Sequence, residues 1–440
     1  MTVACATKRF VLRFGLEASG AVALPTKRVE KNMGKLNADQ WRVVIASFLG
    51  WALDAFDFFI LVFTLPAIAA TFGVKVPDVA YAIFLTLATR FIGAFIFGRL
   101  GDKYGRKPIL MLDIILYSVL GAMAAFAPSL AGFLFLRALF GVAMGGEWGL
   151  GSSLAMESIP PQSRGFVSGI LQCGYPTGFL LASVVFGLFY NAHLFGFVIG
   201  WRGMFLFSLL PALLVLFIRG AVPESAAFEE AAKAGVSKPG FFQSLSANWG
   251  LSIYLIVLML AFNLFSHGTQ DLYPVFLEKQ HKFDHSTVSW VLIVANLGAI
   301  AGGLAFGILS EKIGRANAIT IASLIALPAI PLWAYGSSAG VLALGAFVMQ
   351  VGVQGAWGVV PAHLNELVPG PVRATLPGLV YQIGNFLASY NAPFQAKLAE
   401  TPGNSYGFAL AIVAGVVAVV LAIFIRFTPE KRGETISVAS

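Results

Sequence analysis

The stretch from Asn263 to Asp271 holds the side chains best suited to acid–base chemistry in this chain. It places an amide, an imidazole and a carboxylate inside an apolar segment long enough to cross a bilayer. On a helix, Asn263, His267 and Asp271 follow one another at four-residue spacing and form one polar stripe. Ionisable groups at that depth are costly and usually mark a substrate or proton path. The stripe is suited to carrying a proton; a polar seam that joins two membrane helices is the alternative.

Three further ionisable side chains lie inside apolar segments. Arg90 precedes Gly98 by eight residues, so about 12 Å of helix separate it from that end. A guanidinium at this depth needs an anion, and a substrate carboxylate matches its two parallel donors. A permanent bridge to Asp54 or Asp57 is the alternative. These aspartates share one helix face, where either could carry a proton or neutralise an arginine.

The composition indicates the elements that position these groups. Of 440 residues, 58% are hydrophobic and 11% are charged, whereas soluble chains are about half apolar and about one quarter charged. Apolar runs of helical spanning length recur, without the short alternating segments of a membrane barrel. We predict an all-α polytopic membrane protein with twelve spans, at 43–70, 79–100, 109–127, 130–152, 165–189, 200–219, 248–277, 286–309, 316–335, 338–364, 374–397 and 404–426.

The spans divide the chain into an N-terminal tail (1–42), a six-helix half (43–219), a solvated linker (220–247), a second six-helix half (248–426) and a C-terminal tail (427–440). Most of the 29 lysines and arginines fall in the tails and even-numbered loops. The positive-inside rule therefore predicts cytoplasmic termini in a plasma or inner cell membrane. The net charge of +8 then faces lipid headgroups, and no nucleic-acid partner is expected. Residues 1–32 are either a tail or an over-extended start upstream of Met33.

Two cysteines and five histidines show no spacing typical of a metal site. The sequence contains no nucleophile elbow and no phosphate-binding loop. We expect no cofactor, no metal, no enzymatic activity and no obligate protein partner.

The two halves repeat each other at one constant offset. The segment 98–107 recurs at 307–316, and 146–149 recurs at 355–358. Equal numbers of spans give both halves the same orientation, so we predict two parallel six-helix repeats with a site between them at mid-membrane. Acids and bases recur as well, and we expect them to form a cytoplasmic gate that opens with conformation: Asp102, Arg106, Glu157 and Arg164 in the first half, and Glu311, Arg315, Glu366 and Arg373 in the second.

The Gly-x-Leu-Gly-Asp-x-x-Gly-Arg-Lys loop at 98–107 resembles the signature of the major facilitator superfamily, over about residues 40–430. The segments 51–59 and 145–149 resemble the lactate and sialic acid permease branch. The 263–271 motif is similar to that of Jen-type lactate/pyruvate:proton symporters, although Val275 stands where that motif has threonine. Gln382 and Asn385 match a second substrate-contact motif of that group, and Arg90 matches its intramembrane arginine.

The resemblance implies proton-coupled symport of a small monocarboxylate, with lactate or pyruvate as first choice. A symporter for sialic acid or an aromatic carboxylate is the alternative, followed by a nutrient sensor that does not transport. Gln382 and Asn385 either bind substrate or lock helices together, and Glu147 either pairs with a neighbouring helix, which we favour, or carries a proton. The expected substrate-binding residues are Arg90, Asn263, Gln270, Gln382 and Asn385, and the expected proton-coupling residues are His267, Asp271, Asp54 and Asp57.

Overall fold

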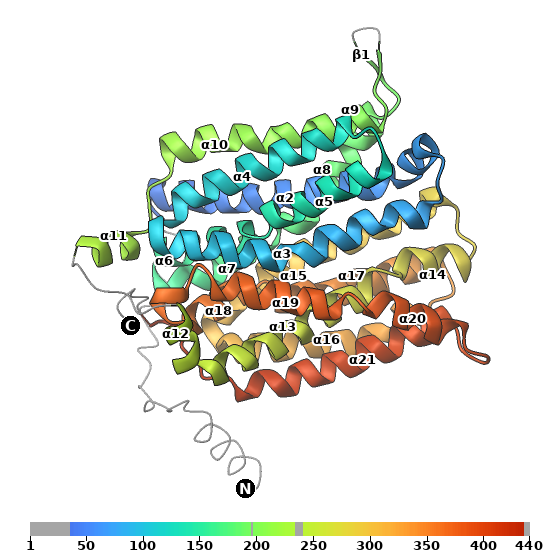
Figure 1. The fold of residues 1–440 in the computed structure, drawn as a ribbon. Helices are drawn as coiled ribbons and strands as arrows, with labels where there is room; N and C mark the ends of the chain where they lie inside the picture. Colours follow the sequence, from blue (N-terminus) through green and yellow to red (C-terminus); the bar gives the residue numbers. More distant parts are fainter. Residues whose placement is uncertain (1–35, 195–196, 234–240, 435–440) are drawn as a thin grey trace, which may run out of the picture.

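The computed structural model describes residues 36–194, 197–233 and 241–434. Long helices lie side by side in two groups, the blue-to-green first half and the yellow-to-red second half (Figure 1). This confirms the all-α fold built from two six-helix halves. The segment 1–32, interpreted as a tail or an over-extended start, lies outside the described residues.

The first half contains nine α-helices, three short 3-10 turns and a two-strand hairpin among its described residues. The helices are α2 (Ala38–Phe72), α3 (Val76–Tyr104), α4 (Arg106–Met123), α5 (Leu130–Met144), α6 (Glu147–Ser158), α7 (Arg164–Gln172), α8 (Gly174–Phe189), α9 (Trp201–Leu206) and α10 (Leu210–Ala221). The turns are η1 (Ala124–Phe126), η2 (Pro161–Ser163) and η3 (Phe207–Leu209), and antiparallel β1 (His193–Leu194) pairs with β2 (Phe197–Val198).

The linker contributes two short helices, α11 (Ala226–Lys233) and α12 (Phe241–Ala247). The second half then follows the same plan as the first. Its elements are α13 (Trp249–Gln270), α14 (Tyr273–Lys279), α15 (His285–Ile313), α16 (Arg315–Tyr335), α17 (Ala339–Trp357), α18 (Val360–Leu367), η4 (Gly370–Val372), α19 (Leu376–Ala388), α20 (Asn391–Glu400), α21 (Tyr406–Phe424) and η5 (Ile425–Phe427).

Eleven stretches of the described chain are helical, long and apolar enough to cross a membrane. The remaining predicted span, 374–397, contains two shorter helices, α19 and α20, which are separated at Ser389 and Tyr390. Each is too short to cross alone, since a span takes about 20 residues. The predicted passage is therefore made by two consecutive helices.

The predicted span 248–277 is also interrupted. Helix α13 ends at Gln270 and α14 begins at Tyr273, with two turn residues between them. Pro274 favours the break, because a proline ring clashes with the carbonyl four residues earlier, here that of Gln270. The polar stripe consequently ends at a helix terminus, with Asp271 in the C-cap position.

Matching glycines end corresponding helices in the two halves. Gly105 has a φ of +110° and separates α3 from α4, and Gly314 has a φ of +94° and separates α15 from α16. This backbone region is readily available only to glycine. The repeated loop therefore makes the same sharp turn twice, at one end of the bundle. We call this end, which also carries α11 and α12 at the left of Figure 1, the charged end, and the opposite one the far end.

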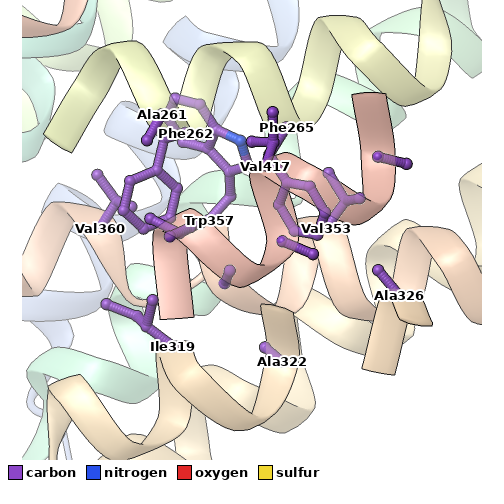
Figure 2. Close-up of a cluster of buried hydrophobic side chains, with 14 of the residues drawn as sticks. Ala261, Phe262, Phe265, Ile319, Ala322, Ala326, Val353, Trp357, Val360 and Val417 are labelled. Atoms are coloured by element: carbon purple, nitrogen blue, oxygen red, sulfur yellow. The ribbon is translucent and has the colours of Figure 1, made fainter. Parts of the chain in front are cut away.

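Apolar side chains fill the interior of each half. In the second half, Phe262 and Phe265 of α13 pack with Trp357 of α17 and small residues of α16 (Figure 2). The halves meet where α3 packs on α19, α7 on α15 and α6 on α18. These three contacts set the positions of the polar side chains described next.

Candidate functional site

The polar stripe of α13 meets α19 through His267. Its Nδ1 lies 3.1 Å from both carboxylate oxygens of Asp271, and its Nε2 lies 2.8 Å from Oδ1 of Asn385. Their side chains are partly accessible, at 25% for His267 and 38% for Asp271. An imidazole held between a carboxylate and an amide oxygen can donate from both nitrogens only when it is protonated.

The other amides expected on this side hold neighbouring helices. Asn263 donates to the Met259 carbonyl of its own helix at 2.8 Å and to the Tyr381 carbonyl of α19 at 3.5 Å, and Gln270 donates to Oε1 of Gln350 on α17 at 2.9 Å. Gln382 of α19 is buried, and no described residue hydrogen-bonds its Oε1. Of the expected residues, the structure brings His267, Asp271 and Asn385 into direct contact, while Asn263, Gln270 and Gln382 lie on the same two helices, α13 and α19.

The first half supplies a buried ion pair. Nη2 of Arg90 lies 2.5 Å from Oδ1 of Asp54, and the two side chains are only 5% and 2% exposed. The bridge considered as an alternative for Arg90 is therefore formed in this conformation. Asp57 lies beside Ser208 instead, and within Coulombic range of the buried Arg137.

An aromatic layer joins the two halves next to these groups. The Tyr381 ring of α19 lies 4.8 Å from Trp148, 5.5 Å from Trp357 and 6.3 Å from Trp51, measured between centroids. Tyr175 of α8 adds a fifth ring, 6.0 Å from Trp51. We call these five side chains the aromatic layer. Trp148 and Trp357 are repeat equivalents, and both contact Tyr381, Trp148 with a tilted ring and Trp357 edge-on.

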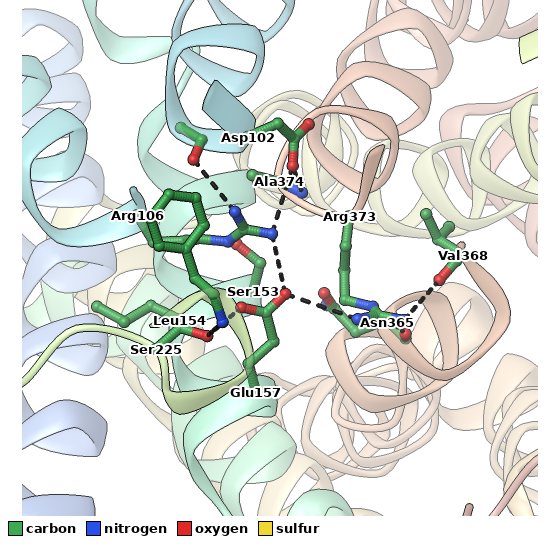
Figure 3. Close-up of polar contacts among 12 residues, drawn as sticks. Asp102, Arg106, Ser153, Leu154, Glu157, Ser225, Asn365, Val368, Arg373 and Ala374 are labelled. Atoms are coloured by element: carbon green, nitrogen blue, oxygen red, sulfur yellow. Dashed lines mark hydrogen bonds and ion pairs between the residues drawn. The ribbon is translucent and has the colours of Figure 1, made fainter. Parts of the chain in front are cut away.

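At the charged end, the first-half cluster surrounds Arg106 (Figure 3). Its Nη2 lies 3.0 Å from Glu157 and 3.4 Å from Asp102, and all three side chains are buried. In the second half, Arg315 repeats the arrangement, 2.9 Å from Glu366 and 3.1 Å from Glu311. Three of the four charges predicted in each half are thus paired within that half.

The same charges also pair between the halves, beyond the arrangement expected within each half. Arg373 lies 3.7 Å from Glu157, and Arg164 lies 3.9 Å from Glu366. Asp102 accepts from the backbone amides of Ala374 and Thr375 at 3.0 and 3.1 Å. Glu311 accepts from the amide of Gly165. The halves are therefore joined at this end by acceptors and donors that both repeats supply.

The first residues of the linker are bonded to the charged end and do not form the solvated segment that the sequence predicted. Glu224 accepts from the backbone amides of Arg106 and Lys107 at 3.1 Å, at the start of α4, and Ser225 donates to Glu157 at 2.5 Å. Burial raises the pKa of Glu224 above its ordinary value, although these amides oppose the shift. In the second half, Glu430 accepts from Ala316 at 3.4 Å, at the start of α16.

Several of these groups were not among the expected site residues. The Pro-Glu pairs at 223–224 and 429–430 follow the last helix of each half, and this repetition is a readable sequence signal. Asp113, a lone acid within an apolar span, is fully buried on α4. The sequence around Tyr381 did not mark it as a site residue, because its contacts depend on how the helices pack.

No group of three or more potential metal ligands occurs in the described part of the chain.

The sequence matches the profile of the Major Facilitator Superfamily at residues 47–284 and again at 272–439. It is 30% identical to a carboxylic acid transporter protein homolog of Saccharomyces cerevisiae, over 83% of this chain but only 62% of that protein. It is also 30% identical to the sialic acid transporter NanX of Escherichia coli, over 80% of this chain and 85% of NanX.

Solved structures agree in fold. The proton:xylose symporter XylE superposes with a TM-score of 0.73 at 18% identity, covering 90% of this chain and 98% of XylE. A human organic anion transporter superposes with a TM-score of 0.69 at 17% identity, covering 88% and 100%. Together with the profile match across both halves, the repeated loop and the paired six-helix halves show that this chain belongs to the major facilitator superfamily of membrane transporters.

Proposed function

We propose that the protein is a secondary transporter that carries a small monocarboxylate together with a proton, with lactate or pyruvate as first choice. The observation that carries this proposal is the buried Arg90–Asp54 pair, together with the packing of α3, which holds Arg90, on α19. Arg90 already holds a carboxylate, so the chemistry needed to bind a carboxylate substrate is in place.

The pair also suggests how a proton and an anion become coupled. Replacing Asp54 by a substrate carboxylate would leave Asp54 charged and unpaired, which is strongly unfavourable in a buried site. Protonation of Asp54 removes that charge and frees Arg90 for the substrate. The loaded site then holds one cation and one anion, as the empty site does. Each ligand therefore favours binding of the other.

The second half completes the site. Asn385 and Gln382 on α19 and Asn263 and Gln270 on α13 would bind the rest of the substrate's polar groups, with the aromatic layer against its carbon side. The His267–Asp271 pair is more accessible than Arg90 and Asp54. We assign it a role in sensing the proton at the entrance, and Asp57 a supporting role beside Asp54.

The charged end would be the cytoplasmic side, because most lysines and arginines lie in the tails and loops expected there. In this conformation the halves are bonded at that end, while His267 and Asp271 retain access to solvent. Transport would then require the halves to part at the charged end and close at the far end, as in other transporters built from repeats.

The names of two relatives, a carboxylic acid transporter homolog and a sialic acid transporter, support an acidic substrate. The test is uptake of labelled lactate into proteoliposomes with and without an inward proton gradient. We expect the gradient to drive accumulation above the external concentration. Competition by sialate or benzoate that exceeds competition by pyruvate would instead favour the alternative carboxylates. Binding of lactate without any uptake would indicate a sensor.

A further inference from the structure

Glu147 on α6 is buried between the halves, and none of the described lysines and arginines forms an ion pair with it. Its side chain is 1% exposed, and no ion pair to it occurs within the described ranges. No described residue hydrogen-bonds its Oε2 either. The pairing with a neighbouring helix that we favoured from the sequence is therefore absent. A carboxyl group at such a position is costly to keep charged, so it calls for a functional explanation.

The Glu147 carboxyl contacts α2 at a point one helical turn from Asp54, the proposed proton site. Its Oε1 occupies the space where a side chain on Gly50 of α2 would begin. Gly50 and Asp54 are four residues apart on α2 and thus share one face of that helix. Asp54 and Arg90 are also within Coulombic range of Glu147. Asp113 and Tyr117 of α4 and Tyr381 of α19 are the other titratable groups facing it.

A small cavity begins at the Glu147 carboxyl. It has about 10 Å³ of space for a water molecule and is lined by Ser47, Trp51, Gly151 and, from the second half, Pro361. That volume fits one water. The Trp51 indole N–H also lacks a hydrogen-bond partner among the described residues. Water in this cavity could accept from Trp51 and donate to Glu147, which would satisfy both groups.

The cavity lies between the proposed substrate site and the charged end. Glu147 and Glu157 are ten residues apart along α6, about 15 Å on a helix. On that side, Asn365 of α18 donates to Ser152 of α6 at 3.5 Å, and Arg373 lies 3.7 Å from Glu157. Both contacts join the two halves. Separation of the halves at the charged end would therefore withdraw Pro361 and open the cavity on that side.

We propose that Glu147 is the second proton carrier of the transporter, which passes the proton of Asp54 to water in this cavity and so to the charged end. The inference rests on the proposed function and extends it. Glu147, which is protonated at rest, first releases its proton to the cavity water, and its own O–H bond breaks. The O–H bond of Asp54 then breaks as one forms on the ionised Glu147, so one proton passes in net from Asp54 to the water and Glu147 ends protonated as it began. Asp54 is left ionised and pairs again with Arg90, which expels the substrate carboxylate.

The test compares two transport modes of labelled lactate in the same proteoliposomes: uptake driven by a pH gradient, and counterflow at equal pH. Counterflow does not require net proton release. We expect Glu147→Gln to lower the ratio of gradient-driven uptake to counterflow by about 100-fold, as is typical when a positioned proton acceptor is lost. Glu147→Asp should restore part of this ratio, since it keeps a carboxyl group.

Gly151→Ala tests the cavity without changing a titratable group. Its added methyl would lie 3.5 Å from Oε1 of Glu147 and 3.7 Å from Ser47, so it fills the space without a clash. We expect this variant to lower the same ratio. Gly132→Ala on α5 is the matched control, since its methyl would also meet its nearest atom at 3.5 Å, far from the cavity, and it should leave the ratio unchanged.

A Glu147→Gln variant with the wild-type ratio would overturn the relay while leaving the proposed function intact. If the wild-type protein takes up no lactate under the gradient, both the proposed function and the relay are contradicted. Should Glu147→Gln not be recovered from the membrane, Gly151→Ala decides alone, and a wild-type ratio in that variant would refute the relay.

Discussion

Arg90 and Asp54 form an ion pair in which each charge offsets the burial of the other. A lone arginine at the centre of a membrane helix costs about 2.5–3.5 kcal/mol on insertion scales, and removing one partner of a buried pair costs about 3–5 kcal/mol. The pair is therefore stable only while both charges are present or both are replaced. Under the proposed function, a substrate carboxylate takes the place of Asp54 once that aspartate is neutral.

The first prediction concerns the guanidinium. Arg90→Lys keeps the charge but removes the planar pair of donors that fits a carboxylate, so lactate uptake should fall strongly while the protein still reaches the membrane. Arg90→Ala should abolish uptake. The measurement is initial uptake in proteoliposomes, normalised to the amount of folded protein. Near-normal uptake by Arg90→Ala would exclude Arg90 as the anion site.

The second prediction concerns Asp54. Asp54→Asn keeps the size of the side chain but cannot be ionised, so Arg90 is permanently available to the substrate. We expect lactate counterflow to persist and accumulation driven by the pH gradient to be lost. Asp39→Asn, an exposed acid on the same helix, is the control and should behave as wild type. If Asp54→Asn still accumulates lactate, proton coupling belongs to His267 and Asp271.

Helix breaks, rather than continuous spans, position the polar groups. Helix α13 ends directly before Asp271, which contacts His267, and Pro274 follows three residues later. The break between α19 and α20 lies one turn beyond Asn385. Interrupted helices are found where membrane transporters bind ligands, because the ends of the segments leave backbone groups available. Hydropathy alone predicted both segments as uninterrupted.

The third prediction tests the first of these breaks. Pro274→Ala restores a backbone N–H and removes the clash with the Gln270 carbonyl, so α13 and α14 can merge. Pro274 stands in the first turn of α14, where proline is tolerated, so the unfolding midpoint should change little. Lactate uptake should nevertheless fall, since Asp271 is reoriented. Pro328→Ala, inside the continuous helix α16, should leave uptake unchanged. Full uptake by Pro274→Ala would show that the break is incidental.

The fourth prediction concerns pH and the linker. Because the pKa of Glu224 is raised in the folded protein, the folded state binds this proton more tightly than the unfolded chain does. Its contribution to stability is therefore fully present below the ordinary pKa of about 4.3 and is lost as pH rises through the raised value. Thermal unfolding in detergent should show wild type losing stability relative to Glu224→Gln across that window. Glu229→Gln, exposed on α11, should show no such trend.

At the scale of the whole molecule, much of the fold could be predicted because the sequence repeats. The glycine loops at 98–107 and 307–316 recur at a fixed offset, and this required two halves of equal orientation. The pairing of Arg164 with Glu366 could not be predicted, because it depends on how the two halves meet rather than on either repeat. The cavity beside Glu147 could not be predicted for the same reason, since Pro361 of the second half forms part of its lining.

The last prediction follows from this meeting of halves. Asp102 accepts hydrogen bonds from Ala374, and from both the amide and the hydroxyl of Thr375. Bonds to a charged acceptor contribute about 1.5–3 kcal/mol each, so Asp102→Asn should favour separation of the halves at the charged end. Cys173 is a native reporter: it is buried, and its thiol contacts the Ile300 carbonyl of the second half.

In a Cys5→Ser background, Asp102→Asn should raise the rate at which a membrane-permeable maleimide alkylates Cys173 by about 5- to 150-fold, the range of typical coupling free energies. Asp39→Asn, which loses only an exposed pair with Arg42, should leave the rate unchanged. Lactate binding should alter the alkylation rate in the parent protein, because the substrate must bias the same equilibrium in order to be transported. An unchanged rate in Asp102→Asn would mean that the contacts of Asp102 do not hold the halves together.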